Sequence, residues 1–134
     1  MTWLFALFLV AHALIHASFV APQPPATAGG PQWPFDLGHS WILSPLGLDG
    51  DITRLLGVAL IVLTFAGFGL AALAVVGILG DGTFVPGVAV GSVASLALLA
   101  VFFSPWFVVG VGIDAVLLWA VLAARWTPQA GFPG

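Results

Sequence analysis

Four long apolar stretches are the feature that most constrains how this chain can fold. A helix that crosses a membrane needs about 20 mostly apolar residues, because each residue adds about 1.5 Å along the helix axis. The chain is therefore predicted to be an all-α polytopic membrane protein, a four-transmembrane-helix bundle that forms a single transmembrane domain over residues 1–134. The predicted spans cover about 2–21, 53–79, 83–104 and 106–126, with a loop, 22–52, between the first two.

Helix-breaking residues separate these stretches. Pro22 and the Pro/Gly-rich segment after it cannot continue the first helix. Gly80-Asp81-Gly82 is a turn signal between the second and third spans, and Pro105 stands between the third and fourth. The 43 residues from 83 to 125 are about twice the length of one crossing, so Pro105 is predicted to mark a turn.

The charge content excludes several classes of function. Only 5% of the residues are charged, against about 25% in an ordinary soluble domain. Asp114 lies in the middle of a predicted span, whereas the other charged residues lie between the apolar stretches or at their ends. Without a basic run the chain has nothing to neutralise a phosphate backbone, so no nucleic-acid partner is expected. The absence of Cys excludes disulfides and thiolate metal sites. The partner that composition does predict is the lipid bilayer.

The few charges also predict an orientation. An even number of spans places both termini on one side, which Arg125 marks. The opposite side carries Arg54 together with Asp36, Asp49 and Asp51. Because positive residues are retained on the inner side, this distribution favours cytoplasmic termini.

The loop between the first two spans is predicted to be irregular at first and then to lie in the membrane interface, over the mouth of the bundle. Asp36 is placed to cap a short helix there. Tryptophan favours the depth of the lipid headgroups. Five residues are therefore predicted interface anchors: Trp3, Trp33, Trp41, Trp106 and Trp126.

His12 and His16 are the most informative local pattern. Their spacing places both imidazoles on one face of the first span, about one turn apart. Such a pair can bind one metal ion if other helices supply further ligands. It cannot provide both axial ligands of one haem, so a bis-His haem would need His39 or a second protomer.

Asp114 is predicted to reach the same depth as the two histidines, counting about 1.5 Å per residue from the loop side. The three side chains are therefore candidates for one site, with His39 as a weaker candidate ligand. An Asp-His group in a membrane can exchange protons, bind a metal ion or orient its ligands, or form a neutral hydrogen-bonded couple that holds helices together. The sequence leaves these alternatives open.

Small residues predict where helices pack closely. Gly87, Gly91 and Ser95 form a ridge with a spacing of four residues in the third span. Gly110 and Gly112 in the fourth span would also admit another helix or a ligand close to the backbone.

Two motifs resemble those of a family of small, four-span bacterial membrane proteins that are poorly characterised. One is the pair His12 and His16 followed by Phe19, and the other is the segment 104–110 followed by a polar residue in the last span. Members of that family often have Asn where Asp114 stands. The resemblance implies the four-span architecture, and it brings no activity with it. The expected location is a bacterial inner membrane, with both termini cytoplasmic.

The sequence therefore predicts a small integral membrane protein with an intramembrane His/Asp site for a metal ion, haem or small ligand. One alternative is an accessory subunit of a larger respiratory, photosynthetic or transport complex, or a homo-oligomer. A further alternative is an enzyme or transporter for a lipophilic or protonated substrate, with the His/Asp group as acid and base. No phosphate loop, nucleophile elbow or zinc-peptidase motif is present, so the sequence does not favour an enzyme.

Overall fold

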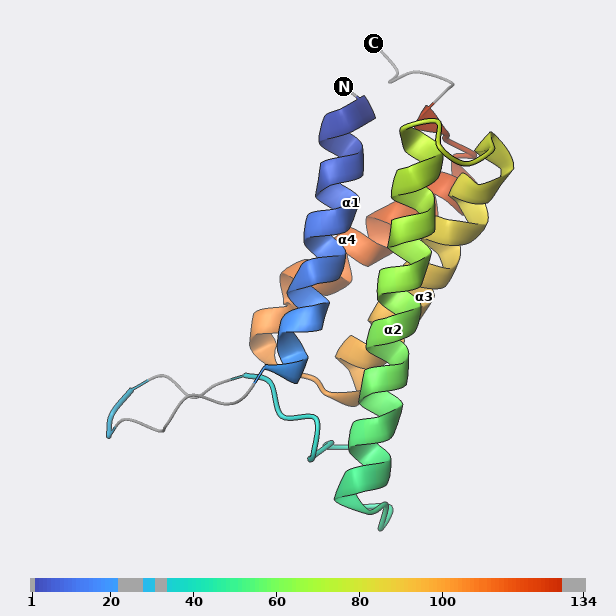
Figure 1. Cartoon of the computed structure of the whole chain (residues 1–134). Coiled ribbons are helices and arrows are strands. Elements are labelled where there is room, and N and C mark those ends of the chain that lie inside the picture. Colours follow the sequence, from blue (N-terminus) through green and yellow to red (C-terminus); the bar gives the residue numbers. More distant parts are fainter. Residues whose placement is uncertain (1, 22–27, 31–33, 129–134) are drawn as a thin grey trace.

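The architecture is an all-α bundle of four long helices, seen in a computed structural model that describes residues 2–21, 28–30 and 34–128 (Figure 1). This confirms the predicted fold class. The long helices are α1 (Thr2–Ala17), α2 (Gly50–Val75), α3 (Phe84–Val101) and α4 (Val108–Leu118). Short helical turns extend α1, α3 and α4: η1 (Ser18–Val20), η2 (Asp81–Thr83), η3 (Pro105–Phe107) and the π-helical η4 (Trp119–Ala123).

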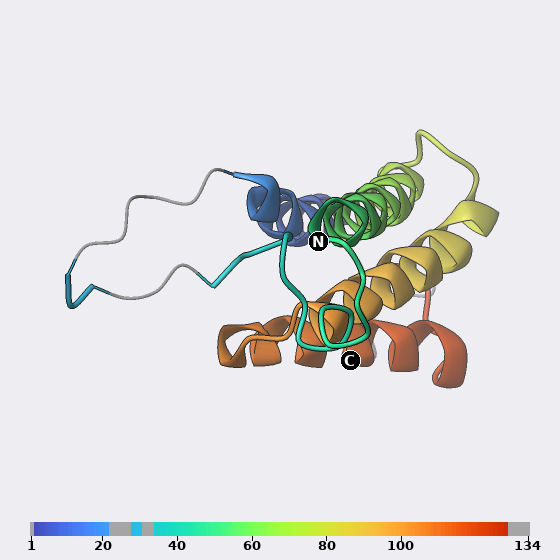
Figure 2. The same ribbon diagram turned by 90° about the horizontal axis from the view of Figure 1, so that it is seen from below.

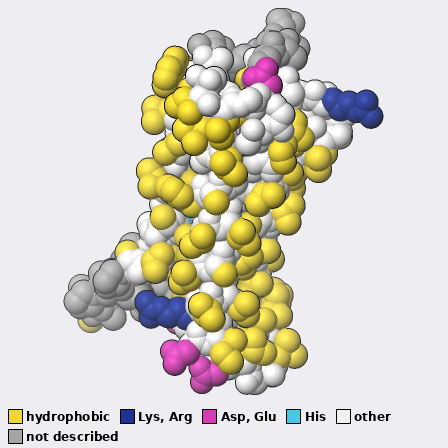
Figure 3. All heavy atoms as spheres, turned by 45° about the vertical axis from the view of Figure 1, so that its right-hand side comes forward, with side chains coloured by type: hydrophobic (Ala, Val, Ile, Leu, Met, Phe, Trp, Pro, Cys, Tyr) yellow, Lys and Arg dark blue, Asp and Glu magenta, His cyan; other side chains and the backbone are white. Residues whose placement is uncertain are grey.

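Each helix with its extension is long and apolar enough to cross a membrane. The charged side chains outside the bundle interior lie at its two ends, with apolar side chains over the length between them (Figure 3). The start of α1 and the end of η4 lie at the same end of the bundle (Figure 1). The chain is therefore an integral membrane protein by length, composition and the placement of its charges.

The second span begins and ends earlier than predicted, and local chemistry explains both differences. α2 starts at Gly50 because the Asp49 carboxylate accepts a hydrogen bond from the Asp51 backbone N–H at 2.7 Å and caps the helix. It ends before Gly77, whose φ of +78° reverses the chain. The Ile78 N–H then donates to the Leu73 carbonyl at 2.9 Å, which satisfies one of the last free carbonyls.

The helices pack in chain order. α1 lies beside α2, α2 beside α3, and α3 beside α4 (Figure 2). Over the described residues, α1 and α4 are packed much less closely than these three pairs. The bundle therefore has one open side, between its first and last helices.

The contact between α2 and α3 is the closest in the bundle, because glycines face each other there. A Cβ atom added to Gly67 would lie 2.6 Å from the Gly91 Cα and 2.8 Å from the Gly87 carbonyl oxygen. The two glycines predicted as a packing ridge thus lie against α2. Such close approach gains dispersion contacts, which hold helices together where the hydrophobic effect cannot.

The interior consists of two apolar clusters with polar side chains between them. The first cluster lies toward the end of the bundle where α1 starts. The second lies toward the end that carries the loop between α1 and α2. The first cluster includes Leu9, Phe68, Phe84, Val88 and Leu117. The second includes Phe19, Leu37, Leu98, Phe102 and Phe107.

The described part of the loop is fixed to the loop end of α3. The Ser40 hydroxyl donates to the Val101 carbonyl at 2.6 Å, and the Trp41 indole N–H donates to the Ala100 carbonyl at 2.8 Å. The prediction that Asp36 caps a helix is wrong, because its carboxylate instead accepts from the Gly38 N–H at 2.9 Å in a local turn.

Replacing Gly67 with Ala tests the close approach of α2 and α3. The added methyl group would overlap the α3 backbone, which cannot yield as a side chain can. We expect Gly67→Ala to destabilise the protein by about 1–3 kcal/mol, measured as a lower midpoint of thermal unfolding in detergent. Gly69→Ala is the matched control, because its Cβ would meet nothing within 4 Å. Equal midpoints for the two variants would contradict the packing.

Candidate metal centre

Four buried polar side chains meet between the two apolar clusters. α1 contributes His12 and His16, α3 contributes Ser95, and α4 contributes Asp114. None is more than 4% exposed, and the Asp114 side chain is fully buried. The i, i+4 spacing brings the two imidazole centres within 4.9 Å on one face of α1. The predicted meeting of the two histidines with Asp114 is therefore present in the structure.

Hydrogen bonds join the four side chains in one chain of contacts. His12 Nε2 lies 2.9 Å from Asp114 Oδ1, and His16 Nε2 lies 2.6 Å from Ser95 Oγ. The Ser95 hydroxyl also donates to Asp114 Oδ2. α1 and α4, which are otherwise loosely packed, are thus connected through the Asp114 carboxylate.

With Asp114 ionised and His16 neutral, the direction of each hydrogen bond follows from the number of protons available. An ionised Asp114 can only accept, so His12 Nε2–H and the Ser95 O–H both donate to it. The Ser95 oxygen has then used its proton and must accept from His16 Nε2–H. This assignment leaves His16 Nδ1 as an acceptor, and it is a buried nitrogen without a hydrogen-bond partner.

The Asp114 charge requires compensation at this depth. An isolated carboxylate in an apolar medium is strongly unfavourable, and it is either protonated or paired with a positive charge. Arg54 and Arg125, the only Lys or Arg residues in the sequence, are exposed. Compensation therefore has to come from a proton on the cluster or from a bound cation.

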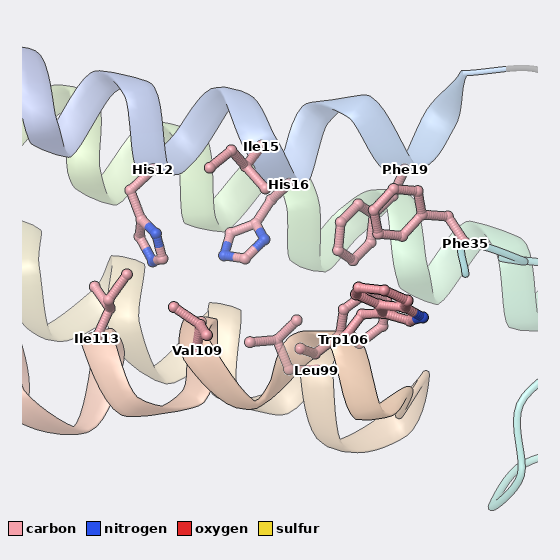
Figure 4. Close-up of a pocket in the computed structure, with 11 residues that line it drawn as sticks. His12, Ile15, His16, Phe19, Phe35, Leu99, Trp106, Val109 and Ile113 are labelled. Carbon is pink, nitrogen blue, oxygen red and sulfur yellow. The ribbon is translucent and has the colours of Figure 1, made fainter. Parts of the chain in front are cut away.

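A cavity of about 230 Å³ adjoins the cluster, and the two histidines form part of its wall (Figure 4). Three rings line its loop end, with the centre of Phe19 4.0 Å from that of Phe35 and 5.0 Å from that of Phe107. Its wall is almost entirely apolar. The polar groups of the cluster thus border an apolar space within the bundle.

The other residues predicted for a site lie elsewhere. His39 is exposed in the loop and outside the cluster. Gly110 faces Leu99 and borders the cavity, whereas Gly112 has open space where a Cβ would be.

The predicted tryptophan anchors differ in their surroundings. Trp3, Trp41 and Trp106 are exposed. Trp126 is half-buried, with its ring centre 5.2 Å from that of Phe5, and it packs against the first apolar cluster. Trp33 lies outside the described residues.

Ser95 belongs to the site, although the sequence pattern predicts a different role for it. The spacing from Gly91 predicts it only as a small residue of the packing ridge, whereas in the structure it bridges His16 and Asp114. The signal that could have found it is a hydroxyl group inside a span, where a polar side chain needs a hydrogen-bond partner.

Comparisons with protein-family models, curated proteins and solved structures found no match for this chain. The resemblance to small four-span bacterial proteins therefore stays a prediction. Any function has to be argued from the site itself.

Ser95 and Ser92 offer a matched test of the hydrogen-bond network. Both are fully buried in α3, but the Ser92 hydroxyl has no hydrogen-bond partner. Ser95→Ala would leave His16 and Asp114 each short of one hydrogen bond, so we expect a loss of about 1–3 kcal/mol in the free energy of unfolding. Ser92→Ala should be neutral or slightly stabilising. Reversible unfolding in detergent measures both, and a larger loss for Ser92→Ala would contradict the network.

Proposed function

We propose that this membrane protein binds one divalent transition-metal ion, of the Zn²⁺ or Fe²⁺ class, at His12, His16 and Asp114. One observation carries the proposal: each of these buried residues offers a ligand atom, and the three atoms lie within 4.8 Å of one another. A cation there would also compensate the Asp114 charge. The proposed function is an intramembrane metal site with at least one coordination position left for another ligand.

The ligand types favour this class of metal. Two imidazoles and one carboxylate are the protein ligands of several catalytic zinc sites and of non-haem iron sites, which keep positions open. Mg²⁺ and Ca²⁺ prefer sets of oxygen ligands, and Cu⁺ prefers sulfur. The Ser95 hydroxyl lies beside this ligand set and can orient Asp114 through its hydrogen bond.

The distances require little rearrangement. Two ligands that are each about 2.0–2.2 Å from a zinc ion lie at most about 4.4 Å apart. Small rotations of the two imidazoles would bring all three ligand atoms within that limit. Burial of the three side chains restricts the alternatives they can adopt.

The cavity favours a single ion over haem. Pockets that enclose drug-sized ligands have volumes of about 300–1,000 Å³, and the space beside the histidines is about 230 Å³. Both histidines also project from the same face of α1 (Figure 4), so they cannot approach a porphyrin from opposite sides. Membership of a larger complex or a homo-oligomer stays a prediction.

Metal analysis tests the proposal directly. After incubation with Zn²⁺ and removal of excess ion, we expect about one zinc per chain by mass spectrometry, because three protein ligands suffice for a tight site. The double variant His12→Leu/His16→Leu should bind zinc at least about 100-fold more weakly. Loss of a hydrogen-bond partner of a ligand already lowers metal affinity by about 10–100-fold, and loss of the ligands themselves should lower it further.

His39→Leu is the matched control, because this histidine is exposed in the loop. It should retain the zinc content of the unaltered protein. Circular dichroism and gel filtration show whether each variant keeps its helical fold. Equal zinc in the double variant and in the unaltered protein would overturn the metal site.

We further infer that the protein lies in a bacterial inner membrane with both termini in the cytoplasm. The support for the orientation is the distribution of the exposed charges: Arg125 and Asp81 at the end of the bundle where α1 starts, and three aspartates with Arg54 at the other end.

Cysteine labelling tests this orientation, and the absence of native Cys makes single-Cys variants unambiguous. Asp81 and His39 are exposed at opposite ends of the bundle. With cytoplasmic termini, a membrane-impermeant maleimide should label His39→Cys in intact cells, and Asp81→Cys only after the membrane is opened. The reverse pattern would place the termini outside.

A further inference from the structure

We propose that the cavity beside His16 binds the hydroxyl-bearing, ring-sized headgroup of a lipophilic molecule, such as an alkylphenol, that enters from the bilayer. This proposal goes beyond the metal site and does not depend on it. It stands on the size and lining of the cavity, on where the cavity opens, and on one unpartnered buried nitrogen.

The volume fits a single aromatic ring with one polar substituent. An apolar cavity of about 150 Å³ is enough to bind benzene, and this one measures about 230 Å³. Phe19, Phe35 and Phe107 supply aromatic surface at its loop end. A flat headgroup can pack against such rings.

The cavity opens toward lipid on the loosely packed side of the bundle. Ile15 on α1 and Val109 on α4 line it, and they are 58% and 72% exposed. Their side chains lie on opposite sides of the space in Figure 4. A molecule dissolved in the bilayer can therefore enter between α1 and α4, with its alkyl tail remaining in lipid.

His16 selects the polar substituent. Its side chain is 2% exposed and forms part of the cavity wall (Figure 4). Its Nδ1 is a buried atom without a partner, and a small rotation of the ring would present it to a ligand in the cavity. A buried polar atom without a hydrogen bond is costly, so a ligand that satisfies it gains affinity. The proton count above makes Nδ1 an acceptor, which calls for a donor on the ligand.

A hydroxyl group meets this requirement in both states of the site. It donates to Nδ1 when the site is free of metal. It can accept from Nδ1–H when Nε2 binds an ion. A carboxylate ligand would instead place a second negative charge beside Asp114, which is unfavourable in an apolar medium. The inferred ligand class is thus a neutral lipophilic alcohol or phenol.

Binding of 4-butylphenol to the whole protein in lipid nanodiscs tests the inference. The protein is first treated with a chelator, so the result is independent of any metal. The imidazole ¹⁵N signals of His16 should shift saturably with the phenol. 4-Butylanisole has nearly the same shape but no O–H, so its half-saturation should need at least about five times more ligand. Butylbenzene should be no better than the anisole.

Two pairs of variants make the outcome decisive. Val109→Trp should block the opening and abolish the shift, whereas Val108→Trp, exposed on the same helix but outside the cavity lining, should not. The His16→Phe variant lacks the His16 signal, so its binding is followed through the ¹⁵N signals of His12. This variant should show no preference for phenol over anisole. The inference is overturned if no saturable shift occurs, if the three compounds bind equally, or if Val109→Trp binds phenol like the unaltered protein.

Both tryptophans replace exposed residues, so the Val109→Trp and Val108→Trp variants test the inference even if His16→Phe does not fold.

Discussion

The burial of one carboxylate among apolar helices is the constraint on which the rest of the site depends. Asp114 is fully buried, and it is stable there only with hydrogen-bond donors and a compensating charge. His12 and Ser95 supply the donors, and Ser95 in turn fixes the orientation of His16. Three helices are thereby held in register at a single depth by a group that would otherwise destabilise them.

The close packing of α2 and α3 makes this arrangement possible. Because glycines let the two backbones approach, α3 is packed closely against α2, and its Ser95 contacts α1 and α4. The opposite side of the bundle is built differently, since α1 and α4 meet through polar side chains and leave an apolar cavity between them. The contact between α2 and α3 thus stabilises the protein, and the side between α1 and α4 contains the cavity beside the buried polar groups.

The cavity between α1 and α4 determines what surrounds the proposed metal site. A metal ion bound by His12, His16 and Asp114 would lie next to a space open to the bilayer and lined by aromatic rings. Polar ligands on one side and lipid on the other are the features expected of a protein that recognises lipophilic molecules by a single polar group. The loop is attached to α3 through Ser40 and Trp41, and its residue Phe35 lines that space.

The sequence by itself determined the four spans, their breaks, and the depth that His12, His16 and Asp114 share, because hydropathy and the helical rise per residue are local properties. Only the tertiary structure decided that the three side chains meet, that Ser95 joins them, and that a cavity opens between α1 and α4. Those facts depend on how far each helix is rotated and which helices are neighbours. Rotation and neighbours are set by packing between residues far apart in the chain, such as Gly67 against Gly91.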